Sequence, residues 1–365
     1  MRPRRVLMTV DAVGGVWRYA IDLCRSLNDS GIEVLLACLG PPPRADQVAE
    51  LAGLLRTQLR VLDAPLDWMA PDAAALAGVP TLLEELARRD GCDLLHLNLP
   101  SQAAGLRTGL PVVVVSHSCV ATWWQAVRGT ALPPEWAWHR NLNAAGFARA
   151  DVVLAPSASQ AAALRATYGL TRGIGVVPNA GQSDMQPSVR RNFVFAAARW
   201  WDEGKNAALL DAAAVAMAWP VRAAGACQAG NGQHFVFRHA EALGPLSHGA
   251  TQTLMRQAAI FASPSRYEPF GLAALEAAQA GAALVLADIP TYREIWSDAA
   301  LLVDPGDPGA FAAAVNGLAQ DPARREALAA QGRARAGQFT AARQLLALLP
   351  AYAAAASSSA SQAAE

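Results

Sequence analysis

Two glutamates in one short segment are the residues best suited to chemistry. Glu268 and Glu276 lie in Ser263-Pro-Ser-Arg-Tyr-Glu-Pro-Phe-Gly-Leu-Ala-Ala-Leu-Glu276, which follows an apolar run and leads into a helical pattern. We expect the helix to begin near Phe270, with Glu268 just before it and Glu276 in its second turn, roughly 9 Å along the axis. Two such carboxylates can bind opposite ends of one ligand. A plain amphipathic helix with an acid near its N-terminus is the alternative.

The backbone between the two glutamates suits an anion. Pro269 fits at or just before a first helical turn, and Gly271 allows the backbone to approach a ligand closely. The amides from Phe270 to Leu272 would be exposed at a helix start, where the helix dipole favours negative charge. The segment therefore predicts a phosphate site between two carboxylates.

Two cations lie on another predicted strand-to-helix loop. Arg199 directly follows the apolar run Phe193-Val-Phe-Ala-Ala-Ala198, and Lys205 precedes a helical pattern. Together they can neutralise a diphosphate, whereas a solvated pair of loop residues is the alternative. A Walker A loop is excluded, because Asn206 follows Lys205 and Arg199 takes the place of the first glycine.

The first half of the chain carries weaker signals. The paired glycines Gly14 and Gly15 follow the first apolar run, where they can approach a phosphate or simply form a tight turn. His117 lies in Ser116-His117-Ser118, directly after the run Pro111–Val115, and can bind a ligand hydroxyl or play a structural role. His96 has a similar but less persuasive placement. The sequence has no G-x-G-x-x-G motif for a dinucleotide and no H-E-x-x-H or Cys/His cluster for a metal.

The elements that must position these residues are short apolar runs alternating with helical patterns. This is the βαβ signature of a parallel sheet, and continuous apolar strands imply helices on both faces. The predicted strands of the first half are Arg5–Val10, Glu33–Cys38, Asp93–Leu97, Pro111–Val115, Asp151–Ala155 and Ile174–Val177. Those of the second half are Phe193–Phe195, Pro220–Ala224, His234–Phe237, Ala259–Ala262, Ala283–Leu286 and Ala300–Val303.

The predicted architecture is therefore two doubly wound α/β domains, 1–180 and 181–335, joined by a linker at Gly181–Arg191. Ligands of such sheets bind beyond the carboxyl ends of the strands, so we expect the functional loops to face a cleft between the domains. A helical pattern runs from Phe311 to Tyr352 with a break near Gly337, and the Ala/Ser-rich residues 354–365 read as a flexible tail.

Composition narrows the function and the compartment. The chain has 365 residues, 53% of them hydrophobic and 16% charged, with 30 basic and 30 acidic side chains. A protein that binds nucleic acid over its whole surface would carry an excess of basic residues, so the balanced charge of this chain argues against that class. The five cysteines show no metal or disulfide spacing, no apolar run is long enough to cross a bilayer, and the N-terminus does not read as a signal peptide. A cytoplasmic protein is expected, with Arg2, Arg4 and Arg5 as a patch for weak contact with anionic lipid.

Taken together and in this order, the segments resemble the family 4 retaining glycosyltransferases, also called group 1 glycosyltransferases, which have the GT-B fold. The resemblance spans nearly the whole chain, and its strongest element is the E-x7-E pattern of Glu268 and Glu276. Arg199 and Lys205 match the family's diphosphate-binding pair. Gly14-Gly15 matches its N-terminal glycine loop, and His117 matches its donor-sugar histidine.

The resemblance implies retaining, metal-independent transfer of a hexose-type sugar from a UDP- or GDP-linked donor to a glycan or lipid-linked acceptor, with no cofactor. It implies that residues 336–353 return to the N-terminal domain as a helix. The implied catalytic residues are Glu268, His117, Arg199 and Lys205. The implied donor-binding residues are Gly14, Gly15, Arg199, Lys205, Pro269, Phe270, Gly271, Leu272 and Glu276. Trp123, Trp124 and Trp138 are candidates for stacking on acceptor sugars, with packing as the alternative.

The sequence departs from the family pattern at three points. Ala198 stands where a glycine often precedes the arginine, Gly225-Ala-Cys227 only partly matches the turn after its strand, and Ser118 follows His117 where members often carry an acid. These departures bear on the sugar and base contacts. The rival functions are a non-transferring GT-B enzyme, such as a nucleotide-sugar epimerase or a phosphorylase, and a non-catalytic sugar-nucleotide-binding protein. Retention of both cations and both glutamates disfavours the latter.

Overall fold

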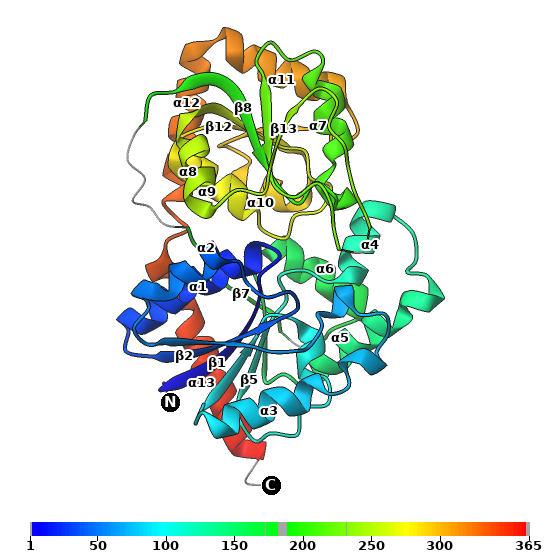
Figure 1. Ribbon diagram of the computed structural model, residues 1–365, viewed down its shortest axis with the longest axis vertical. Coiled ribbons are helices and arrows are strands. Elements are labelled where there is room, and N and C mark those ends of the chain that lie inside the picture. Colours follow the sequence, from blue (N-terminus) through cyan, green and yellow to red (C-terminus); the bar gives the residue numbers. More distant parts are fainter. Residues whose placement is uncertain (1, 172, 182–187, 231, 363–365) are drawn as a thin grey trace. The chain divides into compact units, whose positions relative to one another are not determined.

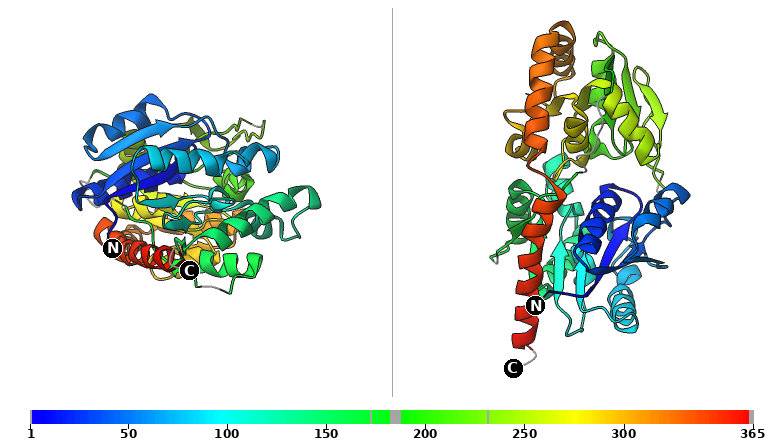
Figure 2. Two further views of the ribbon diagram at one scale, coloured as in Figure 1. Left: turned by 90° about the horizontal axis from the view of Figure 1, so that it is seen from below. Right: turned by 90° about the vertical axis from the view of Figure 1, so that its left-hand side faces the viewer.

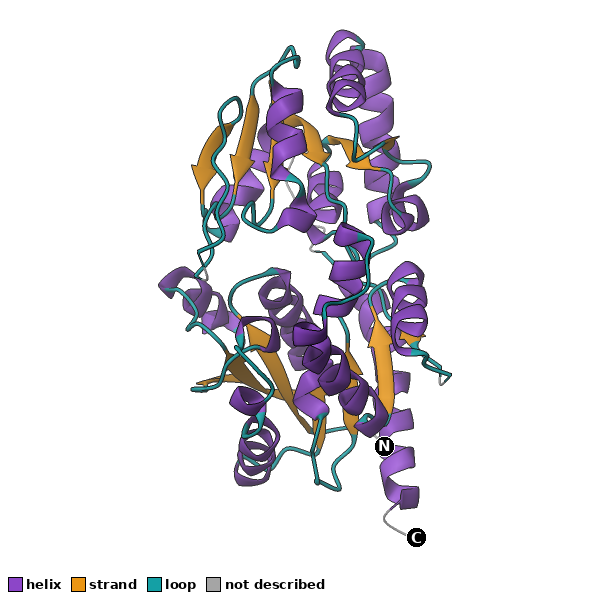
Figure 3. Cartoon of the chain, turned by 90° about the vertical axis from the view of Figure 1, so that its right-hand side faces the viewer, coloured by secondary structure: helices purple, strands orange, loops and turns teal. Residues whose placement is uncertain are grey.

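The chain forms two parallel sheets of short apolar strands, so the predicted α/β fold class is confirmed. The computed structural model describes residues 2–171, 173–181, 188–230 and 232–362 (Figure 1). It divides into two compact units: unit 1 comprises residues 1–180 and 341–365, and unit 2 comprises residues 181–340. Helices cover both faces of each sheet (Figure 3), as buried parallel strands require.

Unit 1 is built on a seven-stranded parallel sheet in the order β3-β2-β1-β4-β5-β6-β7. Its central strand β1 pairs with β2 on one side and β4 on the other, with Val6 opposite Val34 and Leu94. The strands are β1 (Arg5–Asp11), β2 (Glu33–Leu39), β3 (Thr57–Val61), β4 (Leu94–Leu97), β5 (Val112–Val115), β6 (Val152–Ala155) and β7 (Gly175–Val176).

The helices of unit 1 include one from the far end of the chain. They are α1 (Gly15–Asp29), α2 (Ala45–Ala49), α3 (Val79–Arg89), α4 (Val120–Arg128), α5 (Ala137–Arg149), α6 (Ala158–Tyr168) and α13 (Ala341–Gln362). The terminal helix α13, red in Figure 2, runs along unit 1 and packs against α1, β5 and β6. Its inward side chains Leu348, Tyr352 and Ala355 are fully buried.

Unit 2 repeats the same plan with a six-stranded parallel sheet in the order β10-β9-β8-β11-β12-β13. The strands are β8 (Arg191–Ala197), β9 (Val221–Ala224), β10 (Glu241–Gly244), β11 (Ala258–Ser263), β12 (Ala283–Ala287) and β13 (Leu301–Val303). The helices are α7 (Ala207–Ala214), α8 (His248–Gln257), α9 (Leu272–Ala280), α10 (Pro290–Trp296), α11 (Pro308–Gln320) and α12 (Pro322–Ala336).

The end of the chain differs from the prediction in two ways. Residues 336–340 belong to unit 2, where the Phe339 ring packs edge-on against Phe270 at 5.5 Å between centroids, so the returning helix begins only at Ala341. The predicted tail is helical as far as Gln362, and Ser359 donates a hydrogen bond to the carbonyl of Gly109. Residues 363–365 lie outside the described part of the chain, as do residues 182–187 of the predicted linker.

One predicted strand does not form, and two edge strands, β3 and β10, were not predicted. The segment His234–Phe237 forms only an isolated bridge from His234 to Gln228, and the edge strand is β10 instead. The apolar pattern of residues 234–237 comes from the rings of Phe235 and Phe237. Phe237 packs on Trp200 at 5.3 Å between centroids, whereas Val236, between the two phenylalanines in sequence, is exposed. The edge strand β3 was not predicted, because its sequence TQLRV is polar and only partly buried.

Candidate functional site

The sequence candidates lie where each sheet reverses its strand order. The reversal falls between β1 and β4 in unit 1 and between β8 and β11 in unit 2. Ligands of open α/β sheets bind beyond the carboxyl ends of the strands at this point. In unit 2, Arg199 and Lys205 follow β8 and Glu268 follows β11. In unit 1, Gly14-Gly15 follows β1, and His117 follows β5, which lies next to β4 in the sheet.

Unit 2 brings Lys205 and Glu268 into direct contact. The Lys205 Nζ donates to Glu268 Oε2 at 2.6 Å, and both side chains are about four-fifths buried. The two loops are also tied by their backbones, since the Arg266 amide donates to the carbonyl of Gly204 at 2.8 Å. A cation and a carboxylate are therefore held together at the reversal point, where a diphosphate that binds the cation has to compete with the carboxylate.

Asn206 fixes the turn that carries Lys205. Its backbone is left-handed, with φ of 58°, which is uncommon for a residue other than glycine. Its side-chain amide donates to the carbonyls of Pro264 and Pro305 at 3.0 and 2.9 Å. This asparagine connects the loop after β8 to the loop after β11. Sequence reasoning did not assign it a role, although an asparagine at a strand-to-helix turn is a recognisable signal.

Arg199 is held by neighbours in its own loop. Its guanidinium lies 3.3 Å from Asp202 Oδ2 and stacks over the Trp201 ring at 5.4 Å. The next loop presses closely on this one, since a Cβ on Gly225 would lie 1.8 Å from the carbonyl oxygen of Ala198. Gly225 is thus a packing requirement of the site that the partial sequence match did not reveal.

The helix after β11 begins two residues later than predicted. Helix α9 starts at Leu272, and Gly271 before it has φ of +92°, a conformation that ends the loop and cannot continue a helix. Pro269 and Phe270 therefore lie in the loop, with the Phe270 ring buried in the core of unit 2. The N-terminus of α9 has no side-chain cap, so its first amides are suited to an anion. Glu276 is half-buried on the second turn of α9.

The Tyr292 ring packs against the backbone of Gly271. A Cβ on Gly271 would lie 2.7 Å from Tyr292 Cε1, so only a glycine fits without displacing the ring. The Tyr292 hydroxyl bonds to Ser263 Oγ at 2.8 Å, and burial together with the charge of Glu268 raises the pKa of Tyr292. Tyr292 thus connects α10 to the loop that presents Glu268.

In unit 1, the glycine loop is a closed turn. Asp11 Oδ1 accepts from the amides of Val13 and Gly14, both at 3.0 Å, and Gly14 caps α1 with extended backbone. The Gly14 amide is therefore occupied within the loop. Gly15, the first residue of α1, remains the better placed of the two glycines to approach a ligand.

The protonation of His117 follows from its neighbour. Asn98 Nδ2 faces the backbone carbonyl of Thr9 at 2.6 Å, which can only accept, so Asn98 Oδ1 is the atom that faces His117 Nε2 at 2.9 Å. An amide oxygen only accepts as well, so Nε2 carries the proton. Burial, with a smaller effect of His96, lowers the pKa of His117 to about 3. The neutral ring therefore has a lone pair on Nδ1 that can accept from a hydroxyl.

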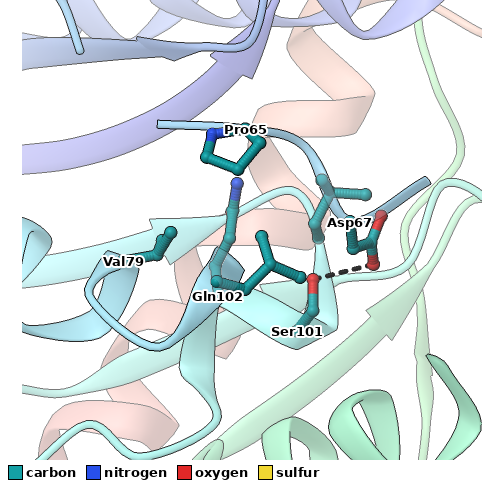
Figure 4. Close-up of a pocket in the computed structure, with 7 residues that line it drawn as sticks. Pro65, Asp67, Val79, Ser101 and Gln102 are labelled. Carbon is teal, nitrogen blue, oxygen red and sulfur yellow. Dashed lines mark hydrogen bonds between the residues drawn. The ribbon is translucent and has the colours of Figure 1, made fainter. Parts of the chain in front are cut away.

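A buried carboxylate lies near the same edge of unit 1. Asp67 accepts from Ser101 Oγ at 2.8 Å (Figure 4). It also accepts from the amide of Trp68 at 2.7 Å, and burial raises its pKa. The side chains of Asp67 and Ser101 line a cavity of about 10 Å³, which is close to the space that one water molecule requires. Sequence reasoning did not single out either residue.

The predicted aromatic and basic surfaces are largely engaged in contacts within unit 1. Trp124 packs on Trp136 at 6.0 Å, Trp138 stacks on His139 at 3.5 Å, and Arg128 lies over Trp123 and Trp124. The N-terminal arginines have partners too: Arg2 bonds to the carbonyl of Ser30, Arg4 lies 3.7 Å from Asp93, and Arg5 lies 3.8 Å from Glu33.

The described part of the chain shows no group of three or more His, Cys, Asp or Glu side chains placed to hold a metal ion. Within the same residues, no helix is both long and apolar enough to cross a membrane.

Comparison with known families identifies the family of this chain. Residues 13–180 match Glycosyltransferase Family 4, and residues 232–335 match Glycosyl transferases group 1. The chain belongs to the family 4, group 1 glycosyltransferases. The resemblance noted from the sequence is thereby confirmed, and the boundary between the two matches falls in the stretch that contains Arg199 and Lys205.

Two solved structures show the same fold, and one curated relative matches part of the sequence. Sucrose-phosphate synthase from Thermosynechococcus elongatus superposes with a TM-score of 0.77 at 18% identity, covering 94% of this chain and 97% of that one. Anabaena Alr3699/HepE in complex with UDP-glucose gives 0.72 at 17% identity, covering 93% and 96%. A glycogen synthase from Mycobacterium tuberculosis is 41% identical over 108 residues. That match covers 29% of this chain and spans a quarter of the relative's length. The fold is therefore the GT-B fold.

Proposed function

We propose that this family 4 glycosyltransferase transfers a hexose-type sugar, with retention at the anomeric carbon, from a UDP- or GDP-linked donor to a glycan or lipid-linked acceptor. The observation that carries the proposal is the contact of Lys205 with Glu268 at the strand-order reversal of unit 2, beside the uncapped N-terminus of α9. Cations, a carboxylate and free amides are the groups that a sugar diphosphate requires.

Each residue has a role in this scheme. Arg199, Lys205 and the first amides of α9 stabilise the charge that develops on the leaving diphosphate. Glu276 accepts hydrogen bonds from the ribose, and Glu268 contacts the hydroxyls of the sugar near the reacting carbon. An acceptor hydroxyl attacks the face that the diphosphate leaves, and a donor phosphate oxygen takes its proton. The two cations neutralise the diphosphate without a metal ion.

His117 serves in binding in this scheme. Its low pKa and its protonated Nε2 leave Nδ1 as an acceptor for one sugar hydroxyl. A group with a pKa of about 3 is a weak base at neutral pH, so it does not remove the acceptor proton. The Asn98 amide keeps the ring in the accepting tautomer.

We place the enzyme in the cytoplasm, because the five cysteines are free thiols that suit a reducing compartment. Contact with a membrane surface would be weak, since Arg4 and Arg5 already face acidic partners.

The test combines a donor screen with product analysis. A panel of UDP- and GDP-sugars is screened by thermal shift, and each stabilising donor is then incubated in radiolabelled form with candidate glycan and lipid-linked acceptors in the presence of EDTA. We expect transfer that resists EDTA and a product that retains the donor's anomeric configuration by NMR. An isomerised free sugar nucleotide would indicate an epimerase instead, and an inverted product would refute retention.

A further inference from the structure

A chain of buried polar side chains connects the terminal helix of unit 1 to His117. The Tyr352 hydroxyl on α13 lies 2.8 Å from His96 Nδ1, and the opposite ring nitrogen, Nε2, lies 3.2 Å from the Tyr19 hydroxyl on α1. The Tyr19 ring then meets the His117 ring edge-on, with 4.3 Å between centroids. Tyr352 and His96 are fully buried, and Tyr19 is 3% exposed.

The Tyr352 hydroxyl serves to bond His96, because packing alone does not require it. A phenylalanine would fill the same space between α13 and the sheet, whereas a buried hydroxyl is unfavourable unless it is bonded. Burial lowers the pKa of His96 to about 4, so its ring is neutral and offers one donor and one acceptor to the two tyrosines. Loss of either tyrosine hydroxyl leaves a buried ring nitrogen without that partner.

The structure assigns Tyr352 a positioning role: through His96 and Tyr19 it sets the orientation of the His117 ring. This inference rests on the proposed function, in which His117 accepts a hydrogen bond from the donor sugar. Asn98 fixes one nitrogen of that ring from the end of β4, and the Tyr19 ring packs against the His117 ring. Tyr352, on the last helix, holds Tyr19 in place through their shared partner His96.

The role predicts a separation between catalysis and nucleotide binding. The bonds of Lys205, Asn206 and Glu268 described above are all made within unit 2, and α13 belongs to unit 1. A fault in the tyrosine chain should therefore leave the affinity for a free nucleoside diphosphate unchanged. It should lower turnover, because His117 would be misaligned where the donor sugar reacts.

The test compares Tyr352→Phe with Leu348→Val, which trims another fully buried side chain of α13 without touching the polar chain. We expect both variants to lose stability, but only Tyr352→Phe to lower kcat, by about 10-fold, with the affinity for free UDP or GDP unchanged. In protein labelled with ¹⁵N-histidine, Tyr352→Phe should shift the imidazole signals of His96 and His117, and Leu348→Val should not.

A second variant keeps the inference open to refutation. Tyr19→Phe removes the bond on the other side of His96, so its effect and that of Tyr352→Phe should not add in the double variant. Unmoved His117 signals, or equal kcat for Tyr352→Phe and Leu348→Val, would overturn the inference. If the wild-type protein uses no sugar nucleotide, the proposed function fails. The histidine signals then still decide whether Tyr352 orients His117.

Discussion

At the residue scale, the contact of Lys205 with Glu268 has a consequence for ligand binding. The lysine is neutralised by a carboxylate at 2.6 Å, so a diphosphate gains its full attraction only when Glu268 turns to another partner. In the proposed reaction that partner is the donor sugar. A free nucleoside diphosphate offers no sugar, and Glu268 then opposes its binding. The two glutamates of the E-x7-E pattern should therefore behave differently.

Three substitutions test this division. Lys205→Met and Glu276→Ala should each weaken UDP or GDP binding by roughly 10- to 100-fold, the effect of losing one charge-assisted hydrogen bond. Glu268→Gln should leave that affinity equal to or above the wild-type value, because Lys205 loses its competitor. The same variant should lower turnover by about 10²-fold. Calorimetry with the nucleotide and steady-state kinetics measure the two quantities.

Glu326, an exposed glutamate on α12, provides the matched control, since Glu326→Gln changes the same charge away from the site. It should alter neither affinity nor turnover. If Glu268→Gln weakens the nucleotide as much as Glu276→Ala does, the division of roles is wrong. If no variant loses turnover, the site is misplaced.

The buried histidines make stability depend on pH. The pKa values of His96 and His117, about 4 and about 3, lie below the value of about 6.5 for an unfolded histidine. The unfolded chain therefore binds more protons between these values, and the free energy of unfolding should fall as pH drops below about 6.5. Each histidine contributes at most about 1.4 kcal/mol per pH unit. Melting curves from pH 8 to 4 should show a smaller slope in His117→Gln, whereas His239→Gln, an exposed control, should match the wild type.

At the element scale, Gly271 sets the start of α9. Gly271→Ala adds a Cβ that meets the Tyr292 ring at 2.7 Å in a left-handed backbone, so we expect a loss of about 1–3 kcal/mol in stability and weaker binding of UDP or GDP. Gly249→Ala on α8 is the control, because its Cβ meets nothing within 4 Å. Thermal unfolding and calorimetry measure both effects. Equal behaviour of the two variants would show that the loop is not constrained by its glycine.

The same elements show what the sequence can predict. Central strands such as β1, β5 and β12 are continuous apolar runs because both faces are buried, and they were predicted nearly to the residue. The edge strand β3 lacks that signal. Helix α9 was predicted two residues early, because the ring of Phe270 fits a helix pattern equally well as a buried loop residue.

The candidate site was only partly predictable for a similar reason. Arg199, Lys205, Glu268 and His117 carry charge or a ring nitrogen next to a strand end, which a sequence pattern reveals. Their supporting contacts come from residues far away along the chain. The contact of Tyr352 with His96 joins the last helix to the fourth strand, and no local spacing encodes it.

At the scale of the whole molecule, each unit repeats one sheet order with a reversal beside its first strand, and α13 completes unit 1 from the other end of the chain. A truncation that removes α13 should destabilise unit 1 and leave unit 2 intact. The truncated chain should end at Thr340, because Phe339 packs on Phe270 and Trp296 in unit 2. A cut before Phe339 would remove a ring from that core as well.

A chain that ends at Thr340 loses Leu348, Tyr352 and Ala355, which are all fully buried. Removing two large core side chains typically costs about 4–10 kcal/mol, which is comparable to the stability of an entire domain. We therefore expect unit 1 to become sensitive to protease, while residues 181–340 remain resistant and still bind UDP or GDP by calorimetry. A chain that ends at Ala360 keeps all three side chains and the hydrogen bond of Ser359 to Gly109, and it should match the full-length protein. A resistant unit 1 in the shorter chain would show that α13 is dispensable. Loss of nucleotide binding would show that unit 2 does not hold the donor site by itself.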